Sequence, residues 1–431
     1  MRNILLSGPD GRMFYGYIIV IASSLVMAVS SGAIYSFSVF FEPLQSQFGW
    51  SRAVTSGAFS AFVVLNGAMA IASGRLNDRF GPRIVVSISG AVLGCGFILM
   101  SQVTAVWQLY IAYGIVIAAG FSGAPVPLMS TVARWFNRRR GLMTGIVMAG
   151  TGVGTMVMPP VANWLIYTWD WRVSYAAFGL IVAVVILLAA QLLRRDPSKQ
   201  GLLPFGEIQK ARKRNPAQRV QTGLVLSEAM HTKQFWLLCF ALTGFGYALQ
   251  SVMVHIVIYA RGLGLTPASA AAIMTIIGAM GVAGRIGVGG IADRLGARRP
   301  LAMVLGALAA SLFFLAFTTQ SWTVIAFAVL FGFVYGGTVP LFSHAVAELF
   351  GLRAHGVILG IITCSVGIGS AVGPVVTGYG FDLFGNYTLS FAIGGGVTAV
   401  ATILALLVRP VDSMISRAAA PAERNNGSPS E

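Results

Sequence analysis

A single arginine inside an otherwise apolar stretch is the residue whose type and position most clearly suggest chemistry. Arg285 lies in the stretch MTIIGAMGVAGRIGVGGIADR, eight residues before Asp293, which is about 12 Å along a helix at about 1.5 Å per residue. An uncompensated cation at that depth in a membrane costs at least about 2.5 kcal/mol. A guanidinium offers two parallel N–H donors that match a carboxylate. We therefore predict that Arg285 binds an anionic substrate; a structural arginine bonded to backbone carbonyls is the alternative.

Five weaker candidates surround this prediction. Tyr335, in FVYGG, and the mid-stretch Asn66 and Tyr35 carry polar groups that could bind a substrate oxygen. Tyr247 and His255 follow one another at helical spacing and give their stretch a polar face. His255 is the candidate proton acceptor, because an imidazole titrates near neutral pH. For each of these residues the alternative is ordinary packing or hydrogen bonding.

The elements that position these residues are predicted to be membrane-spanning helices. Hydrophobic residues make up 56% of the chain and charged residues 10%, whereas soluble domains are about 45–50% apolar and about 25% charged. A spanning helix needs about 20 predominantly apolar residues. Such runs cover residues 14–41, 53–73, 83–102, 106–130, 141–167, 173–193, 235–259, 268–289, 300–319, 322–347, 356–380 and 388–408.

Polar segments divide these twelve runs into two halves. The expected organisation is a six-helix half over residues 1–193, a basic, Pro-containing linker over 194–234, a second six-helix half over 235–408 and a disordered tail over 409–431. The fold class is therefore an all-α membrane protein of twelve helices.

The net charge of +16 is a topology signal. With the N-terminus inside, 25 of the 29 Lys and Arg residues fall on the inner side and three on the outer side. This asymmetry follows the positive-inside rule and places both termini in the cytoplasm. It disfavours a nucleic-acid partner and favours the plasma membrane, the inner membrane of a bacterium.

One displacement of 215 residues relates the two halves. GRLNDRFGPR at 74–83 recurs as GGIADRLGAR at 289–298, and Gly141 falls on Gly356 at the same offset. Six helices per half make the repeat a parallel one. Asp78 and Asp293 could cap a neighbouring helix N-terminus, and the loop arginines could pair with carboxylates. We predict gate loops that latch the halves, with a simple turn anchor as the alternative; the loop residues are Gly74, Asp78, Arg79, Gly81, Arg83, Gly289, Asp293, Arg294, Gly296 and Arg298.

The pattern G-x-x-x-D-R-x-G-x-R resembles the signature loop of the major facilitator superfamily. RWFNRRRGLMTGIVMAGTGVG at 134–154 is similar to the fifth-span signature of monocarboxylate transporters, which bacterial oxalate/formate antiporters share in part. The resemblance implies that Arg285 binds a substrate carboxylate and that Tyr335 lies near the central cavity. The mammalian aspartate one turn earlier is replaced by Met280-Gly281, and the turn from Gly360 to Cys364 lacks a second cation. One cation favours one carboxylate.

The function predicted is secondary transport by alternating access of a small monocarboxylate, such as L-lactate or pyruvate, with a proton. An exchanger of the oxalate/formate type and a drug or cation exporter are the alternatives, and a non-transporting sensor is a weaker one. We expect no enzyme activity, no cofactor and no metal site, since the sequence contains no credible nucleophile–base pair or ligand cluster. The expected partners are a small organic anion, a proton and membrane lipid, and a monomer suffices.

Overall fold

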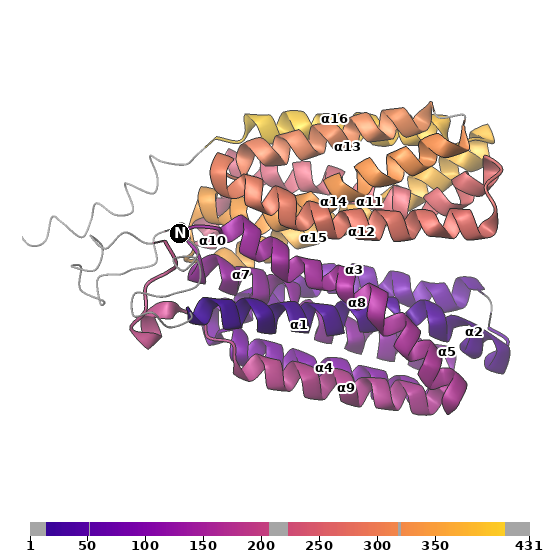
Figure 1. Ribbon diagram of the computed structural model, residues 1–431, viewed down its shortest axis with the longest axis horizontal. Helices are drawn as coiled ribbons and strands as arrows, with labels where there is room; N and C mark the ends of the chain where they lie inside the picture. The colour runs from indigo at the N-terminus through magenta and orange to yellow at the C-terminus, as the bar shows by residue number, and fades with distance from the viewer. Residues whose placement is uncertain (1–13, 51, 207–222, 318–319, 410–431) are drawn as a thin grey trace, which may run out of the picture.

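The computed structural model describes residues 14–50, 52–206, 223–317 and 320–409. Within these residues, twelve helices are long and apolar enough to cross a membrane. The tail predicted to be disordered lies, apart from Arg409, outside the described residues. Two groups of long, roughly parallel helices lie one above the other in Figure 1, the first half below and the second above.

The helices of the first half follow the order of the apolar runs. They are α1 (Tyr15–Tyr35) with α2 (Phe37–Phe48), α3 (Arg52–Phe80), α4 (Pro82–Ser101), the series α5 (Val106–Leu109), η2 (Tyr110–Ile117), α6 (Ala118–Ser122) and α7 (Pro125–Trp135), then α8 (Arg140–Thr168) and α9 (Trp171–Gln191). The second half comprises α11 (Lys233–Gly262), α12 (Pro267–Leu295), α13 (Arg298–Ala316), α14 (Ser321–Phe350), α15 (His355–Phe384) and α16 (Thr388–Leu407).

Two spans are less regular than the sequence predicts. The first bends at Ser36, whose hydroxyl donates to the Gly32 carbonyl at 2.8 Å. The fourth contains the π-helical segment η2, and it also breaks before Pro125, because proline has no N–H for the helical ladder. Helices also run past the predicted apolar ends, α3 to Phe80 and α12 to Leu295. Backbone hydrogen bonding continues there regardless of side-chain polarity.

The linker is partly structured at both of its described ends. It contains the short helices η3 (Pro197–Gln200) and α10 (Leu226–Met230). Phe205 pairs with Phe136 in a parallel bridge, and Gly223 pairs with Gly351 in an antiparallel one. Positions 136 and 351 differ by the repeat offset, so the linker holds equivalent loops of both halves. We call this end of the bundle, where α10 and the first described residues also lie (Figure 1), the linker end.

The halves contact each other closely at the linker end. A Cβ added to Gly74 in α3 would lie 2.1 Å from the Gly356 carbonyl oxygen in α15, and one added to Gly141 in α8 would lie 2.2 Å from that of Gly289 in α12. Such approaches leave no room for a side chain. Glycines at these positions let α3 pack on α15 and α8 on α12.

Candidate substrate site

Arg285 lies where α12 crosses α8 of the other half. Its side chain is buried, with 5% of the residue exposed. One guanidinium N–H donates to the Tyr335 hydroxyl in α14 at 2.9 Å, and the guanidinium carbon lies 5.2 Å from the centroid of that ring. Arg285 Nε is buried without a hydrogen-bond partner among the described residues. The cation is therefore held by one neutral group and has unused donor capacity.

Glycines make the space for this pair. A Cβ at Gly281, one turn before Arg285, would lie 3.0 Å from Tyr335 Cε1 and 3.2 Å from an Arg285 terminal nitrogen. A Cβ at Gly145 in α8 would lie 2.1 Å from the Arg285 carbonyl oxygen. The two glycines thus set the position of the arginine side chain and of its backbone. Helical spacing could indicate only Gly281, one turn before Arg285, whereas no local pattern links Gly145 to it.

Tyr35 brings the first half to the same site. It ends α1 and interacts electrostatically with both Tyr335 and Arg285. Although it lies this close to charged and polar groups of the other half, 51% of Tyr35 is exposed. Arg285, Tyr335 and Tyr35 are the three predicted site residues that the structure brings together.

The predicted polar face of α11 points elsewhere. His255 Nε2 lies 3.1 Å from the Pro374 carbonyl oxygen and Nδ1 lies 3.2 Å from the Tyr387 hydroxyl. A carbonyl only accepts, so Nε2 donates to Pro374, while Nδ1 shares a hydrogen bond with the Tyr387 hydroxyl. Burial, and then the Asp382 carboxylate, raise the pKa of the Tyr387 hydroxyl, which keeps that donor protonated. Both ring nitrogens of His255 are therefore hydrogen-bonded to α15 and to the loop before α16, and its role as a proton acceptor stays a prediction.

Tyr247 and the neighbourhood of Asn66 contact helices other than α12. The Tyr247 ring faces Gly394 of α16, and its backbone carbonyl faces Gly373 of α15. Asn66 lies in α3 beside Gly67, which approaches Cys364 and Gly367 of α15. The Asn66 Oδ1 atom and the Tyr247 hydroxyl are both buried without a hydrogen-bond partner in the described structure. Their role in binding stays a prediction.

The gate loops form two reciprocal caps between the halves. Asp78 accepts the backbone N–H groups of Gly356 and Val357 at 3.1 and 3.0 Å, at the start of α15. Asp293 accepts those of Gly141 and Leu142 at 2.6 and 2.9 Å, at the start of α8. Each carboxylate thus satisfies free donors at the positive end of a helix in the other half.

The arginines at the caps have different kinds of partner. Arg83 bonds Gln191 and Arg298 bonds the Leu406 carbonyl, so these two are bonded to neutral groups in the described part of the chain. The partner of Asp78 is Arg134, which belongs to the fifth-span signature, at 3.0 Å. Arg134 and Asp78 are 56 positions apart, and no local pattern reveals such a pair.

The remaining loop residues shape the turns. Arg79 lies over the Phe80 ring at 5.2 Å. Gly81 and Gly296 adopt φ angles of 85° and 76°, a region that favours glycine. This explains why the repeat has glycine at both positions.

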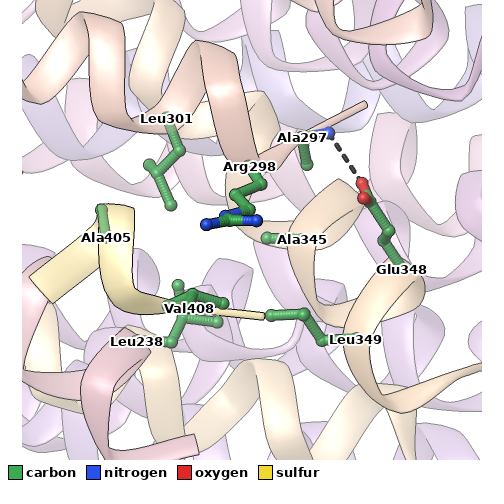
Figure 2. Close-up of a pocket in the computed structure, with 9 residues that line it drawn as sticks. All are labelled: Leu238, Ala297, Arg298, Leu301, Ala345, Glu348, Leu349, Ala405 and Val408. Atoms are coloured by element: carbon green, nitrogen blue, oxygen red, sulfur yellow. Dashed lines mark hydrogen bonds between the residues drawn. The ribbon is translucent and has the colours of Figure 1, made fainter. Parts of the chain in front are cut away.

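A pocket at the linker end is separate from the Arg285 site. Figure 2 shows it between α11, α13, α14 and α16, with the Arg298 side chain among mostly aliphatic neighbours. The Glu348 carboxylate at its edge accepts the Ala297 N–H at 2.7 Å. Among the described residues, no group of three His, Cys, Asp or Glu side chains could hold a metal ion.

Two repeated six-helix halves that close on each other around a buried cation define a membrane transporter fold. The family model for the Major Facilitator Superfamily matches residues 23–319 and 298–431. The chain belongs to this superfamily.

Its relatives include carboxylate transporters. Monocarboxylate transporter 13 of Rattus norvegicus is 27% identical over 393 residues, covering 90% of this chain and 87% of that protein. The Oxalate:formate antiporter of Oxalobacter formigenes is 27% identical over 429 residues, covering 96% and 98%. The crystal structure of the transporter FucP in the outward conformation shares the fold, with a TM-score of 0.72 at 15% identity over 92% of this chain and 100% of that one.

Proposed function

We propose that this transporter moves small monocarboxylates, such as L-lactate or pyruvate, with a proton, by alternating access of a site at Arg285. The observation that carries the proposal is the buried guanidinium, which donates to the neutral Tyr335 hydroxyl and whose Nε has no acceptor among the described residues. A substrate carboxylate would supply the missing charge and acceptors. The names of the relatives support the same class of substrate.

The two tyrosines give the site its polarity. Tyr335 from the second half and Tyr35 from the first would each offer a hydroxyl to the substrate. A substrate that bonds both halves binds the closed arrangement better than either open one. This differential binding is what allows a substrate to promote the change of access.

Orientation follows from the charge asymmetry. We place the linker end in the cytoplasm and the protein in the plasma membrane, because 25 of the 29 cationic residues gather on that side. In the arrangement described, the caps of Asp78 and Asp293 close that side. The site would then exchange substrate with the outer side.

Uptake into proteoliposomes tests the proposal. A labelled panel of lactate, pyruvate, formate, acetate and oxalate is offered with and without an inward proton gradient, to wild type and Arg285→Gln. We expect gradient-driven lactate or pyruvate uptake that falls at least about tenfold in the variant, since loss of a charged hydrogen bond costs about 1.5–3 kcal/mol. Arg261→Gln is the matched control, because Arg261 is an exposed cation at the far end of α11.

The other outcomes separate the alternatives. Uptake that requires preloaded acid would indicate an exchanger, the function in the name of the Oxalobacter relative. Equal uptake by wild type and Arg285→Gln would remove the role of the arginine. Export of organic cations without carboxylate uptake would favour the drug exporter. Among the ion pairs of the described residues, none includes Arg285.

A further inference from the structure

Two histidines lie in the contact between the halves at the linker end. His355 begins α15 and is fully buried, with 0% exposed. It directly precedes Gly356 and Val357, the residues whose N–H groups bond Asp78. His344 lies in α14, and a Cβ added to Gly141 of α8 would be 3.1 Å from its Nδ1. Both imidazoles are therefore built into the closure that the two caps make.

The hydrogen bonds of His355 define its neutral form. Its Nε2 lies 3.0 Å from the Ser343 carbonyl oxygen, so Nε2 carries the hydrogen. The Nδ1 atoms of both His355 and His344 are buried and have no partner in the described part of the chain. A proton added to either Nδ1 would place a charged donor where no acceptor meets it, and burial of such a group is costly.

The charged groups around the histidines also oppose a positive imidazole. Arg134 and Arg140 interact electrostatically with His355, and Arg140 with His344. The carboxylates of this region are used elsewhere in helix caps and ion pairs. The charged groups that make the caps or interact with them or with the histidines are Asp78 from α3, Arg134 from α7, Arg139 and Arg140 at the start of α8, Asp293 from α12, Glu348 from α14, and Arg195 and Asp196 from the linker.

We propose that His344 and His355 form a proton-binding site that opens the linker end. Each imidazole is neutral while the halves touch, and it binds a proton once the halves separate and water reaches Nδ1. Protons then bind the open arrangement and not the closed one, so acidification on the linker side favours opening. For each proton taken up, the ratio of open to closed protein rises by up to about tenfold when the pH falls by one unit. The inference rests on the alternating access proposed above and adds its regulation by pH on that side.

A distance measurement across the closure tests the switch without substrate. Leu76 in α3 and Leu295 in α12 are both 47% exposed and belong to different halves near the linker end. Spin labels on cysteines at these two positions, with the native Cys95, Cys239 and Cys364 changed to alanine, would report opening by electron–electron distance spectroscopy in lipid nanodiscs. In this background we expect the longer distance to gain population between about pH 7.5 and about pH 5.5, where histidine titrates.

The decisive variant is the double substitution His344→Gln with His355→Gln. A glutamine at position 355 keeps an N–H for the Ser343 carbonyl but does not titrate, so we expect the pH response to disappear. His231→Gln is the matched control, because His231 is exposed at the same end, and it should keep the full response. An unchanged response in the double variant, or no response in the labelled parent, would overturn the proposal.

Two further results keep the test decisive. If the double variant does not fold, His344→Gln alone should lower the steepness of the pH response, and an unaltered steepness would count against the site. Absence of carboxylate uptake together with normal pH-dependent opening would defeat the proposed substrate and leave the switch intact. Normal carboxylate uptake with pH-independent opening would defeat the switch and leave the proposed substrate intact.

Discussion

The two caps at the linker end share their backbone geometry and differ in the side chains that support them. Asp78 and Asp293 each accept two consecutive N–H groups at the start of a helix in the opposite half. Around Asp78, Arg134 makes a buried ion pair at 3.0 Å. Around Asp293, the nearby Arg140 instead donates to the Phe136 carbonyl and to Asn137 Oδ1.

The difference shows which part of the cap the repeat preserves. The aspartate, the glycine in its turn and the glycine at the helix start recur at one displacement of 215 residues. The supporting arginine does not, since the position equivalent to Arg134 is Leu349, and the residue equivalent to Arg140 is His355. The two caps thus have the same backbone geometry but unequal electrostatic support. The Asp78 cap, which has the buried ion pair, also holds the helix that begins with His355.

The largest difference between the caps should appear when their arginines are removed. Arg134→Gln takes away the partner of a mostly buried carboxylate, a change that costs about 3 kcal/mol or more. Arg140→Gln removes hydrogen bonds to partly exposed groups and should cost less than about 1.5 kcal/mol. Thermal unfolding of the purified protein in one detergent would compare the two variants. Equal losses of thermal stability in the two variants would show that the Arg134–Asp78 ion pair does not stabilise its cap.

Alanine at the capped glycines should affect the two caps alike. A Cβ at Gly141 would lie 2.2 Å from the Gly289 carbonyl oxygen, and one at Gly356 would lie 2.6 Å from that of Gly74. These neighbours are backbone atoms, so the halves must separate, at about 1–3 kcal/mol per variant. Both variants should raise the long-distance population between labels at positions 76 and 295.

Gly278→Ala is the control for these alanine variants, because an added Cβ there meets no atom within 4 Å. It should leave the label distance unchanged. Opening caused by Gly356→Ala but not by Gly141→Ala would contradict the equivalence of the two backbone contacts.

The smallest effect is expected at the second partner of Arg134. Asp196 lies 3.7 Å from Arg134 at the start of the linker, a distance at which a partly screened pair contributes less than about 1 kcal/mol. Asp196→Asn should lower the unfolding midpoint by less than Asp78→Asn measured in parallel. A larger loss at Asp196 would mean that the linker, and not the loop aspartate, positions Arg134.

Sequence patterns predicted the parts of the site that depend on local features. Arg285 stood out because a charge within an apolar run needs compensation, and its contact with Tyr335 joins two residues already singled out. The sequence showed that α11 has a polar face, but not which neighbouring helix that face meets. His255 meets Tyr387 and Pro374 because α11 packs on α15, and a helix that is apolar almost all round carries little information about its rotation within a bundle.

The sequence alone determined the twelve spans, the parallel repeat and the two aspartates that cap helices, because each follows from hydrophobic length, charge or a local turn. Only the tertiary structure decided that Arg134 supports Asp78, that Tyr35 reaches Arg285 from the other half, and that His355 is enclosed by the closure. These contacts join residues on separate helices. The burial that sets their energies exists only once the halves have come together.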